Sequence, residues 1–276
     1  MTSIRKLAAV CLLCVASSLL ASEVVISHCY EGACPSQQDA EGEYSLIVRP
    51  LFAAAIDLQT QEQLPSWLAY RIVDGSVGVA SLLPREWRAD TLLSRSDEPS
   101  LAEDASTRLV QPDLRGSQDR DYRLTEVTLL AAEQGRLAPM TSFSATPLWD
   151  ELNLLSNRAR LPSGLRLGPW SRLDQSLNAL AQTQSPRDDG RPQPVYVISG
   201  PLPSDESSPA GFFKIALANN SYAAFVFSSS TQSHSDYCAA QATLESLESR
   251  TEVTYFPAAE RLSNDLAAAL GCTSNR

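Results

Sequence analysis

The chain has 276 residues, of which 43% are hydrophobic and 20% are charged, and its formal net charge is −10 at pH 7. This length allows one large domain or two small ones, and either can bury a hydrophobic core. The acidic excess repels polyanions at long range and so opposes nucleic-acid binding, although a local basic cleft can override it.

The first 22 residues have the pattern of a secretory signal peptide. Arg5 and Lys6 precede an apolar run over 7–21 that ends in small residues. The run is short for a membrane span, and no later stretch reaches the ~18 uncharged apolar residues that suggest one. We therefore expect an exported protein, periplasmic or secreted, without a membrane anchor. Its mature part is expected to form a single domain over 23–276.

Four cysteines remain after this leader, namely Cys29, Cys34, Cys238 and Cys272. An even number of cysteines in an exported chain predicts disulfides. The spacing favours pairing Cys29 with Cys34 and Cys238 with Cys272. A metal site made by Cys29 and Cys34 with His28 is the alternative, but this spacing fits zinc poorly.

The early part of the mature chain predicts two strands and then a long surface segment. Residues Tyr44–Val48 and 67–72 are rich in strand-forming residues and flank a polar turn at 59–63, which favours two paired strands. Residues 94–123 are charged, contain proline and glycine, and show no period. This segment is expected to lie at the surface.

An amphipathic helix is predicted around residue 170. Its apolar residues recur at intervals of three and four: Trp170, Leu173, Leu177 and Leu180. Pro169 suits the first position of a helix, where a missing N–H costs nothing. Asp174 and Asn178 are four residues apart and therefore share a neighbouring face.

The last third of the chain predicts buried strands followed by helices. The strands are expected over 195–198, 212–217 and 222–227, the first ending at 199–201, and the closing helices over 237–247 and 258–270. Together with the earlier elements, this order indicates an α+β fold in a single domain. We expect a central, mainly antiparallel sheet flanked by helices.

Several segments between residue 28 and the end carry a resemblance to a known family, in order along the chain: residues 28–35 (HCYEGACP), 65–70 (PSWLAY), 85–90 (REWRAD), 133–139 (EQGRLAP), 155–157 (LSN), 165–174 (LRLGPWSRLD), 197–201 (VISGP), 212–214 (FFK) and 244–256. Together they resemble the DNA/RNA non-specific endonucleases, the ββα-metal nucleases that bacteria export. The resemblance implies a ββα-metal nuclease-like core. In such an enzyme a histidine activates water and a divalent metal assists phosphodiester cleavage.

The core motif of this family reads Asp-Arg-Gly-His, followed by an apolar residue, Ala and Pro. Here Glu133 replaces the aspartate, Gln134 the phosphate-contacting arginine, and Arg136 the histidine. A guanidinium remains protonated and only donates hydrogen bonds, so Arg136 cannot take a proton from water. Loss of a general base typically costs about 10² to 10⁴ in rate.

The family's metal-binding residues are also changed. Arg166 stands where the resemblance places the metal-binding asparagine, and its charge would repel Mg²⁺, which requires oxygen ligands. Asp174 matches the helical glutamate, and Asn178 replaces an arginine one turn later. Because an unpaired carboxylate is costly in a buried cleft, our hypothesis is that Arg136 or Arg166 pairs with Asp174 in place of the metal.

Other polar residues offer few substitutes for the lost groups. His28 lies beside the N-terminal cysteines, and His234 lies in a serine-rich segment that predicts an exposed loop. Asn153 and Asn157 are near the core motif, where turn or capping roles are favoured.

Three functions remain open. The favoured one is an inactive nuclease-fold protein that binds phosphate, nucleic acid or a protein and uses no cofactor. In it, Arg136 and Asp174 occupy the catalytic positions, while Gln134, Arg166 and Asn178 are candidate ligand contacts. The alternatives are an active Mg²⁺-dependent endonuclease with displaced catalytic groups, in which Asp174 holds the metal through water, and a structural periplasmic protein.

Overall fold

The computed structural model describes residues 25–37, 44–58, 64–93, 134–186, 190–204 and 209–272. The predicted signal peptide, the turn at 59–63, the charged segment at 94–123 and Glu133 lie outside these ranges. Within these ranges, no helix is both long enough and apolar enough to cross a membrane.

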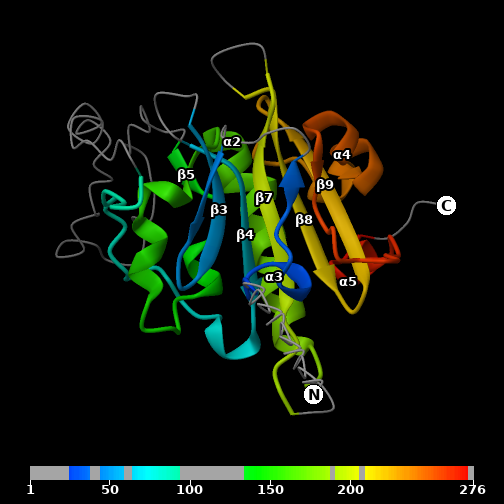
Figure 1. The fold of residues 1–276 in the computed structure, drawn as a ribbon, viewed down its shortest axis with the longest axis horizontal. Coiled ribbons are helices and arrows are strands. Elements are labelled where there is room, and N and C mark those ends of the chain that lie inside the picture. The colour runs from blue at the N-terminus through cyan, green and yellow to red at the C-terminus, as the bar shows by residue number, and fades with distance from the viewer. Residues whose placement is uncertain are drawn as a thin grey trace, which may run out of the picture.

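A seven-stranded antiparallel sheet, counted over the described residues, forms the centre of the molecule (Figure 1). In spatial order it contains β10 (Gln241–Ala242), β9 (Ser221–Ser228), β8 (Gly211–Ala218), β7 (Val195–Leu202), β4 (Pro65–Ile72), β3 (Phe52–Asp57) and β2 (Tyr44–Val48). The pairing of β4 with β7 joins the two halves of the sequence at the middle of this sheet. The predicted α+β class with a central antiparallel sheet is confirmed.

The remaining elements surround this sheet. Two short antiparallel pairs are formed by β1 (Ser36–Gln37) with β11 (Val253–Thr254) and by β5 (Gln134–Arg136) with β6 (Arg158–Arg160). The α-helices are α2 (Ser163–Leu165), α3 (Ser171–Thr183), α4 (Leu244–Thr251) and α5 (Leu266–Ala269). Short 3₁₀ turns are η1 (Tyr30–Gly32), η2 (Asp74–Ser76), η4 (Met140–Ser142), η5 (Trp149–Asn153), η6 (Leu155–Asn157) and η8 (Tyr237–Ala240), and η7 (Arg166–Trp170) is π-helical.

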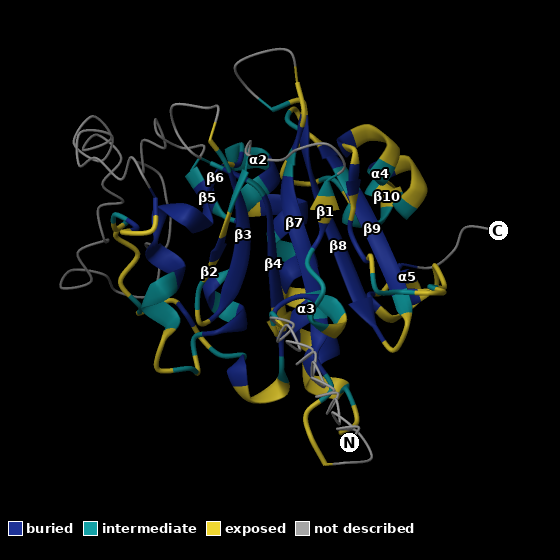
Figure 2. Ribbon diagram, viewed as in Figure 1, coloured by how far each residue is buried: buried dark blue, intermediate teal, exposed yellow. Residues whose placement is uncertain are grey.

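Both faces of the sheet are covered, so β8 is buried along its length and β4 and β7 along most of theirs (Figure 2). In β8, Phe212 belongs to the cluster that contains the apolar face of α3, whereas Phe213 belongs to the cluster that contains Cys29 and Tyr255. This division follows from the alternation of side chains along a strand. One face of the sheet therefore packs on α3, and the other on the N-terminal segment and the region around α4.

The predicted pairing between the two early strands is wrong. Residues Tyr44–Val48 form β2 as expected, but β3 lies between β2 and β4. The run Ala53, Ala54 and Ala55 in β3 has a low strand propensity, and burial on both faces removes the alternation that reveals a strand.

The first of the later strands is longer than predicted. Residues 199–201 do not end β7, which continues to Leu202. At Gly200 an added Cβ would lie 2.4 Å from the Ser66 carbonyl oxygen, so glycine permits the close approach of β4.

The apolar face of the central helix is confirmed, with Leu173 and Leu177 fully buried. The helix begins at Ser171, however, and Pro169 lies in the preceding π-helical turn. The backbone of Gly168 is not helical, and an added Cβ there would lie 2.4 Å from the Ser233 carbonyl oxygen. This long-range contact interrupts the helix where the local pattern predicts its start.

The closing helices are shorter than predicted. Residues 237–247 divide into η8, β10 and the start of α4, because Gln241 pairs with Phe225 of β9. Within 258–270, α5 covers only Leu266–Ala269.

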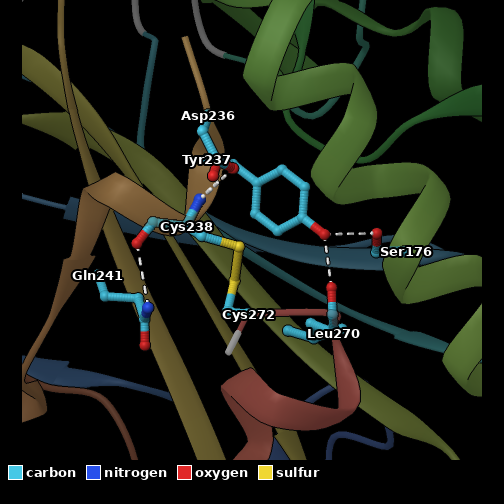
Figure 3. The surroundings of a disulfide bond; sticks show 7 residues. All are labelled: Ser176, Asp236, Tyr237, Cys238, Gln241, Leu270 and Cys272. Atoms are coloured by element: carbon cyan, nitrogen blue, oxygen red, sulfur yellow. Dashed lines mark hydrogen bonds between the residues drawn. A yellow bond between two sulfur atoms is a disulfide. The ribbon is translucent and has the colours of Figure 1, made fainter. Parts of the chain in front are cut away.

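Both predicted disulfides are present, linking Cys29 to Cys34 and Cys238 to Cys272. The disulfide between Cys29 and Cys34 excludes the alternative metal site with His28. Beside the second disulfide, the Tyr237 hydroxyl lies 2.9 Å from the Ser176 hydroxyl on α3 and donates to the carbonyl oxygen of Leu270 (Figure 3). These bonds fasten the C-terminal segment to α3.

Candidate functional site

The degenerate core motif lies on β5 and the turn after it. Asn157 holds this turn by accepting the Ala138 N–H at 2.8 Å and donating to the Ala138 carbonyl oxygen at 3.0 Å. The Ser199 hydroxyl on β7 donates to the Leu137 carbonyl oxygen at 3.3 Å. The backbone that carries Arg136 is therefore attached to the central sheet, and Asn157 has a structural role.

Arg136 is held by neutral hydrogen-bond acceptors. Its Nε donates to the Leu152 carbonyl oxygen at 3.1 Å, and its Nη2 donates to the Arg85 carbonyl oxygen at 2.8 Å and to Asn153 Oδ1 at 2.5 Å. The guanidinium carbon also lies 4.3 Å from the centre of the Trp87 ring. Asn153 thus positions the arginine, in addition to belonging to the η5 turn.

The charges of two other arginines also act on Arg136. Burial, and then the charges of Arg85 and Arg166, lower the pKa of Arg136 to about 10. Burial and Arg85 likewise lower the pKa of Arg166. Arg136 is still a cation at neutral pH and cannot act as a general base there. We call Arg85, Arg136 and Arg166 the arginine cluster.

Asp174 is neutralised by a residue that the sequence hypothesis did not include. Lys214 of β8 forms a buried ion pair with Asp174, and its Nζ lies 3.9 Å from the centre of the Trp170 ring. The hypothesis that Arg136 or Arg166 neutralises Asp174 is therefore wrong. Lys214 lies two residues after Phe212 in β8. Both side chains therefore point to the same face of the sheet, toward α3.

The buried pair perturbs both of its members. Burial raises the pKa of Asp174, and the nearby Lys214 charge opposes that rise. Burial lowers the pKa of Lys214, and Asp174 opposes that change. Since Lys214 is fully buried and Asp174 is only 6% exposed, their charges stabilise each other instead of facing solvent.

The other two predicted ligand contacts lie in different surroundings. Asn178 is buried, and its amide accepts from the Ser142 hydroxyl at 2.6 Å and donates to Thr141 Oγ1 at 3.2 Å. It thereby attaches η4 to α3. Gln134 is half-buried on β5, opposite Arg160 of β6.

The residues at this site do not fit a divalent metal ion. No group of three or more His, Cys, Asp or Glu side chains suited to a metal occurs in the part of the chain that the structure describes. At the positions that the resemblance assigns to base and metal ligand, Arg136 and Arg166 present positive charge, and Asp174 is bound by Lys214. Mg²⁺ binds oxygen ligands, and among these three side chains there are two guanidinium groups and one carboxylate that is already ion-paired.

Neither of the two histidines in the sequence lies in the core motif. His28 is buried, with Nε2 2.8 Å from the Arg49 carbonyl oxygen. His234 is exposed, as predicted, in a loop whose Ser233 carbonyl accepts a hydrogen bond from Arg172 of α3 at 3.0 Å.

Sequence reasoning missed the roles of Lys214, Trp87 and Asn153. Lys214 had a usable signal, because it is a single charge inside the otherwise apolar run of β8. A buried lysine requires a partner, and Asp174 is predicted on a nearby helix face. The roles of Trp87 and Asn153 had no comparable signal, because each depends on the position of Arg136.

The chain has a non-specific endonuclease-type fold. The nuclease of Serratia marcescens is 26% identical over 215 residues, which cover 72% of this chain and 71% of that protein. A chain in the crystal structure of the EndoG/EndoGI complex, described as showing the mechanism of EndoG inhibition, superimposes with a TM-score of 0.53 and 19% identity. That match covers 79% of this chain and 89% of the other. No family model matches the chain.

Proposed function

We propose that the protein is an exported, nuclease-fold binding module that does not hydrolyse phosphodiesters. The observation that carries this proposal is the state of Arg136, a cation held by three hydrogen bonds at the position expected for the general base. The likeness to a protein named nuclease supports the nuclease-like origin. The disulfides support export, because they persist in oxidising compartments.

Two parts of the expected chemistry are replaced at once. A guanidinium has no lone pair with which to accept a proton from water. Asp174, the carboxylate that matches the expected position in kind, is already neutralised by Lys214. The replacement at Arg136 acts against base catalysis and does not disturb the packing of α3 on the sheet.

The direct test is digestion of plasmid DNA and RNA by the purified protein with Mg²⁺ or Mn²⁺. We expect no cleavage above that of matched preparations of Arg136→Gln and Asp174→Asn variants. Cleavage that follows the protein through purification, and that is lost in both variants, would overturn the proposal.

A second test asks whether the fold still supports catalysis. The changes Gln134→Arg, Arg136→His, Arg166→Asn and Asp174→Glu together restore the residues of the resembling family. Because the fold is of the non-specific endonuclease type, we expect the restored protein to cleave DNA with Mg²⁺. A folded but inert quadruple variant would show that more than these four positions has changed.

The second candidate function is an active endonuclease with a displaced base. It is favoured by the close contact of the His234 loop with Gly168, just before α3. In that case Asp174 would hold Mg²⁺ through water and His234 would take the proton. Cleavage that is abolished by His234→Ala and retained in Arg136→Gln would select this candidate.

A further inference from the structure

We propose that the arginine cluster binds the phosphate group of a small phosphorylated compound, without a metal ion. This inference rests on the proposed non-hydrolytic function and names the ligand class of the same site. It concerns Arg85, Arg136 and Arg166, whose side chains come from three separate segments of the chain.

Arg136 is held in place but retains donors for a ligand. Its Nε and Nη2 atoms are used by Leu152, Arg85 and Asn153. Its Nη1 makes no hydrogen bond with any described residue and is not enclosed by the protein. An arginine has five N–H donors in a fixed planar arrangement, so the two on Nη1 point in a defined direction. One edge of the guanidinium can therefore donate to phosphate oxygens.

The groups that hold Arg136 do not cancel its positive charge. Those groups are two backbone carbonyls and one side-chain amide, which carry no net charge. Arg85 and Arg166 both lower the pKa of Arg136, which means that the arginines repel one another. A phosphate would relieve this repulsion and form charge-assisted hydrogen bonds with the guanidinium groups.

The site is also organised before a ligand arrives. Asn153 donates to the Pro84 carbonyl oxygen at 3.1 Å and accepts from Arg136, and the Trp87 ring supports the guanidinium. At Gly135 an added Cβ would lie 3.1 Å from Cδ of Arg166, so glycine leaves room for this side chain across β5. Such preorganisation lowers the ordering cost of binding.

The surrounding charge favours a small ligand over a polynucleotide. The chain has a net charge of −10. Asp150 and Glu151 lie on η5, directly before the Leu152 and Asn153 groups that hold Arg136, but they pair with Arg88 and Arg49 and so add no free charge there. A single phosphate can contact the cluster alone, whereas an extended backbone would bring further phosphates toward a chain of net negative charge.

The test is calorimetric titration of the full mature protein in EDTA at moderate salt. The probes are inorganic phosphate, a nucleoside 5′-monophosphate and an oligonucleotide without terminal phosphates. We expect the first two to bind and the oligonucleotide to bind at least tenfold more weakly. Arg136→Gln should weaken monophosphate binding by about tenfold, since it removes a charge-assisted contact.

Two further variants separate binding from folding. Arg85→Gln changes an exposed side chain, keeps the backbone carbonyl that holds Arg136, and should weaken binding severalfold in a folded protein. Arg250→Gln, on α4 at the other end of the sheet from β5 (Figure 1), removes the same charge and should leave binding unchanged. Urea midpoints of all variants confirm that the compared proteins are folded.

Several results would overturn the inference. These are no binding at millimolar phosphate, binding that Arg85→Gln and Arg136→Gln leave unchanged, binding that EDTA abolishes, or tighter binding of the oligonucleotide. The digestion assay tests the proposed function separately. A protein that neither cleaves nor binds phosphate contradicts this inference alone, whereas one that cleaves DNA and binds phosphate through the arginines contradicts the proposed function alone.

Discussion

Two tryptophan rings in this molecule each support a cation, and the two sites differ in how the charge is balanced. Lys214 lies 3.9 Å from the ring centre of Trp170 and is paired with Asp174 inside the core. Arg136 lies 4.3 Å from the ring centre of Trp87 and is held by neutral oxygens. We call the Lys214 site closed, because its charges balance within the protein. We call the Arg136 site open, because its positive charge remains for a ligand.

This difference follows from burial. A fully buried cation requires a counter-charge within the protein, since no water is present to solvate it. A half-buried arginine can leave one edge to solvent or to an anion. The residues that match the endonuclease positions therefore have two roles in this protein, with Asp174 stabilising the core and Arg136 available for binding.

The largest expected effect comes from breaking the closed site. Lys214→Met leaves Asp174 buried without a counter-charge, so we expect a loss of about 3 to 5 kcal/mol in the free energy of unfolding at pH 7. Without Lys214 the folded protein should hold a proton on Asp174. Stability should therefore recover partly as pH falls below the raised pKa of Asp174. Urea unfolding at pH 7 and pH 5 measures both effects.

The matched control for this prediction combines Lys214→Met with Asp174→Leu. An apolar pair restores packing without a buried charge, so the double variant should be more stable than Lys214→Met alone. A double variant whose loss equals the sum of the two single losses would show that the pair is not coupled. Phosphate affinity of the folded variants should remain at the wild-type value.

The next largest loss of stability is expected from removing the disulfide that supports α3 near the closed site. The disulfide between Cys238 and Cys272 spans 34 residues and adjoins Tyr237, which bonds to Ser176 of α3. Replacing both cysteines by serine should cost roughly 3 to 4 kcal/mol by the chain-entropy relation. Thermal unfolding measures the change.

The shorter loop between Cys29 and Cys34 supplies the comparison for that measurement. The same relation gives about 2 kcal/mol for its separation of 5 residues. Equal losses for the two double-serine variants would contradict an effect of loop length. Neither variant should alter phosphate affinity, because neither disulfide contacts the arginine cluster.

A smaller effect is expected at the open site. Trp87→Leu removes the aromatic face beneath Arg136, a contact worth about 0.5 to 1 kcal/mol, so phosphate affinity should fall about two- to fivefold. Trp87→Phe retains a ring and should retain most of the affinity. If Trp87→Leu lowered stability by as much as Lys214→Met, the contrast between an open and a closed site would be wrong.

The fold could be predicted from the sequence where local patterns determine it. The spacing of Leu173 and Leu177 reveals the buried face of α3, and the cysteine spacing gives both disulfides. Strand β3 was missed because its alanines have a low strand propensity and do not alternate with polar residues. The start of α3 depends on contact between Gly168 and Ser233, which no local pattern encodes.

The resemblance gives the sequence positions of the candidate site, but it does not give the contacts that its side chains make. The aligned motif places Arg136, a cation, where a base is expected, and this assignment stays a prediction. The anchors of Arg136 at Leu152 and Arg85 are backbone carbonyls, which every residue possesses, so side-chain identity gives no sign of them. Lys214 was recoverable in principle, because a charge in an apolar strand requires a partner.

The smallest expected effect concerns His28. Like Lys214 it is a buried basic group, but unlike Lys214 it is neutral. Burial lowers its pKa, the hydrogen bond to the Arg49 carbonyl opposes that change, and the charge of Arg71 adds to the lowering. The unfolded chain then binds more protons than the folded protein once the pH falls below about 6.5. Stability is therefore present above that pH and is lost as the pH falls toward the lowered pKa of the folded state.

A His28→Gln variant should lack this part of the pH dependence. We expect the wild type to lose less than about 1 kcal/mol more than the variant between pH 7.5 and pH 6, as measured by urea unfolding at both values. The comparison uses the difference in slope, so a constant loss caused by the substitution does not affect it. Identical slopes would show that His28 titrates alike in the folded and unfolded chain. Burial alone would then not keep it neutral, and the contrast with the charge-paired Lys214 would need another cause.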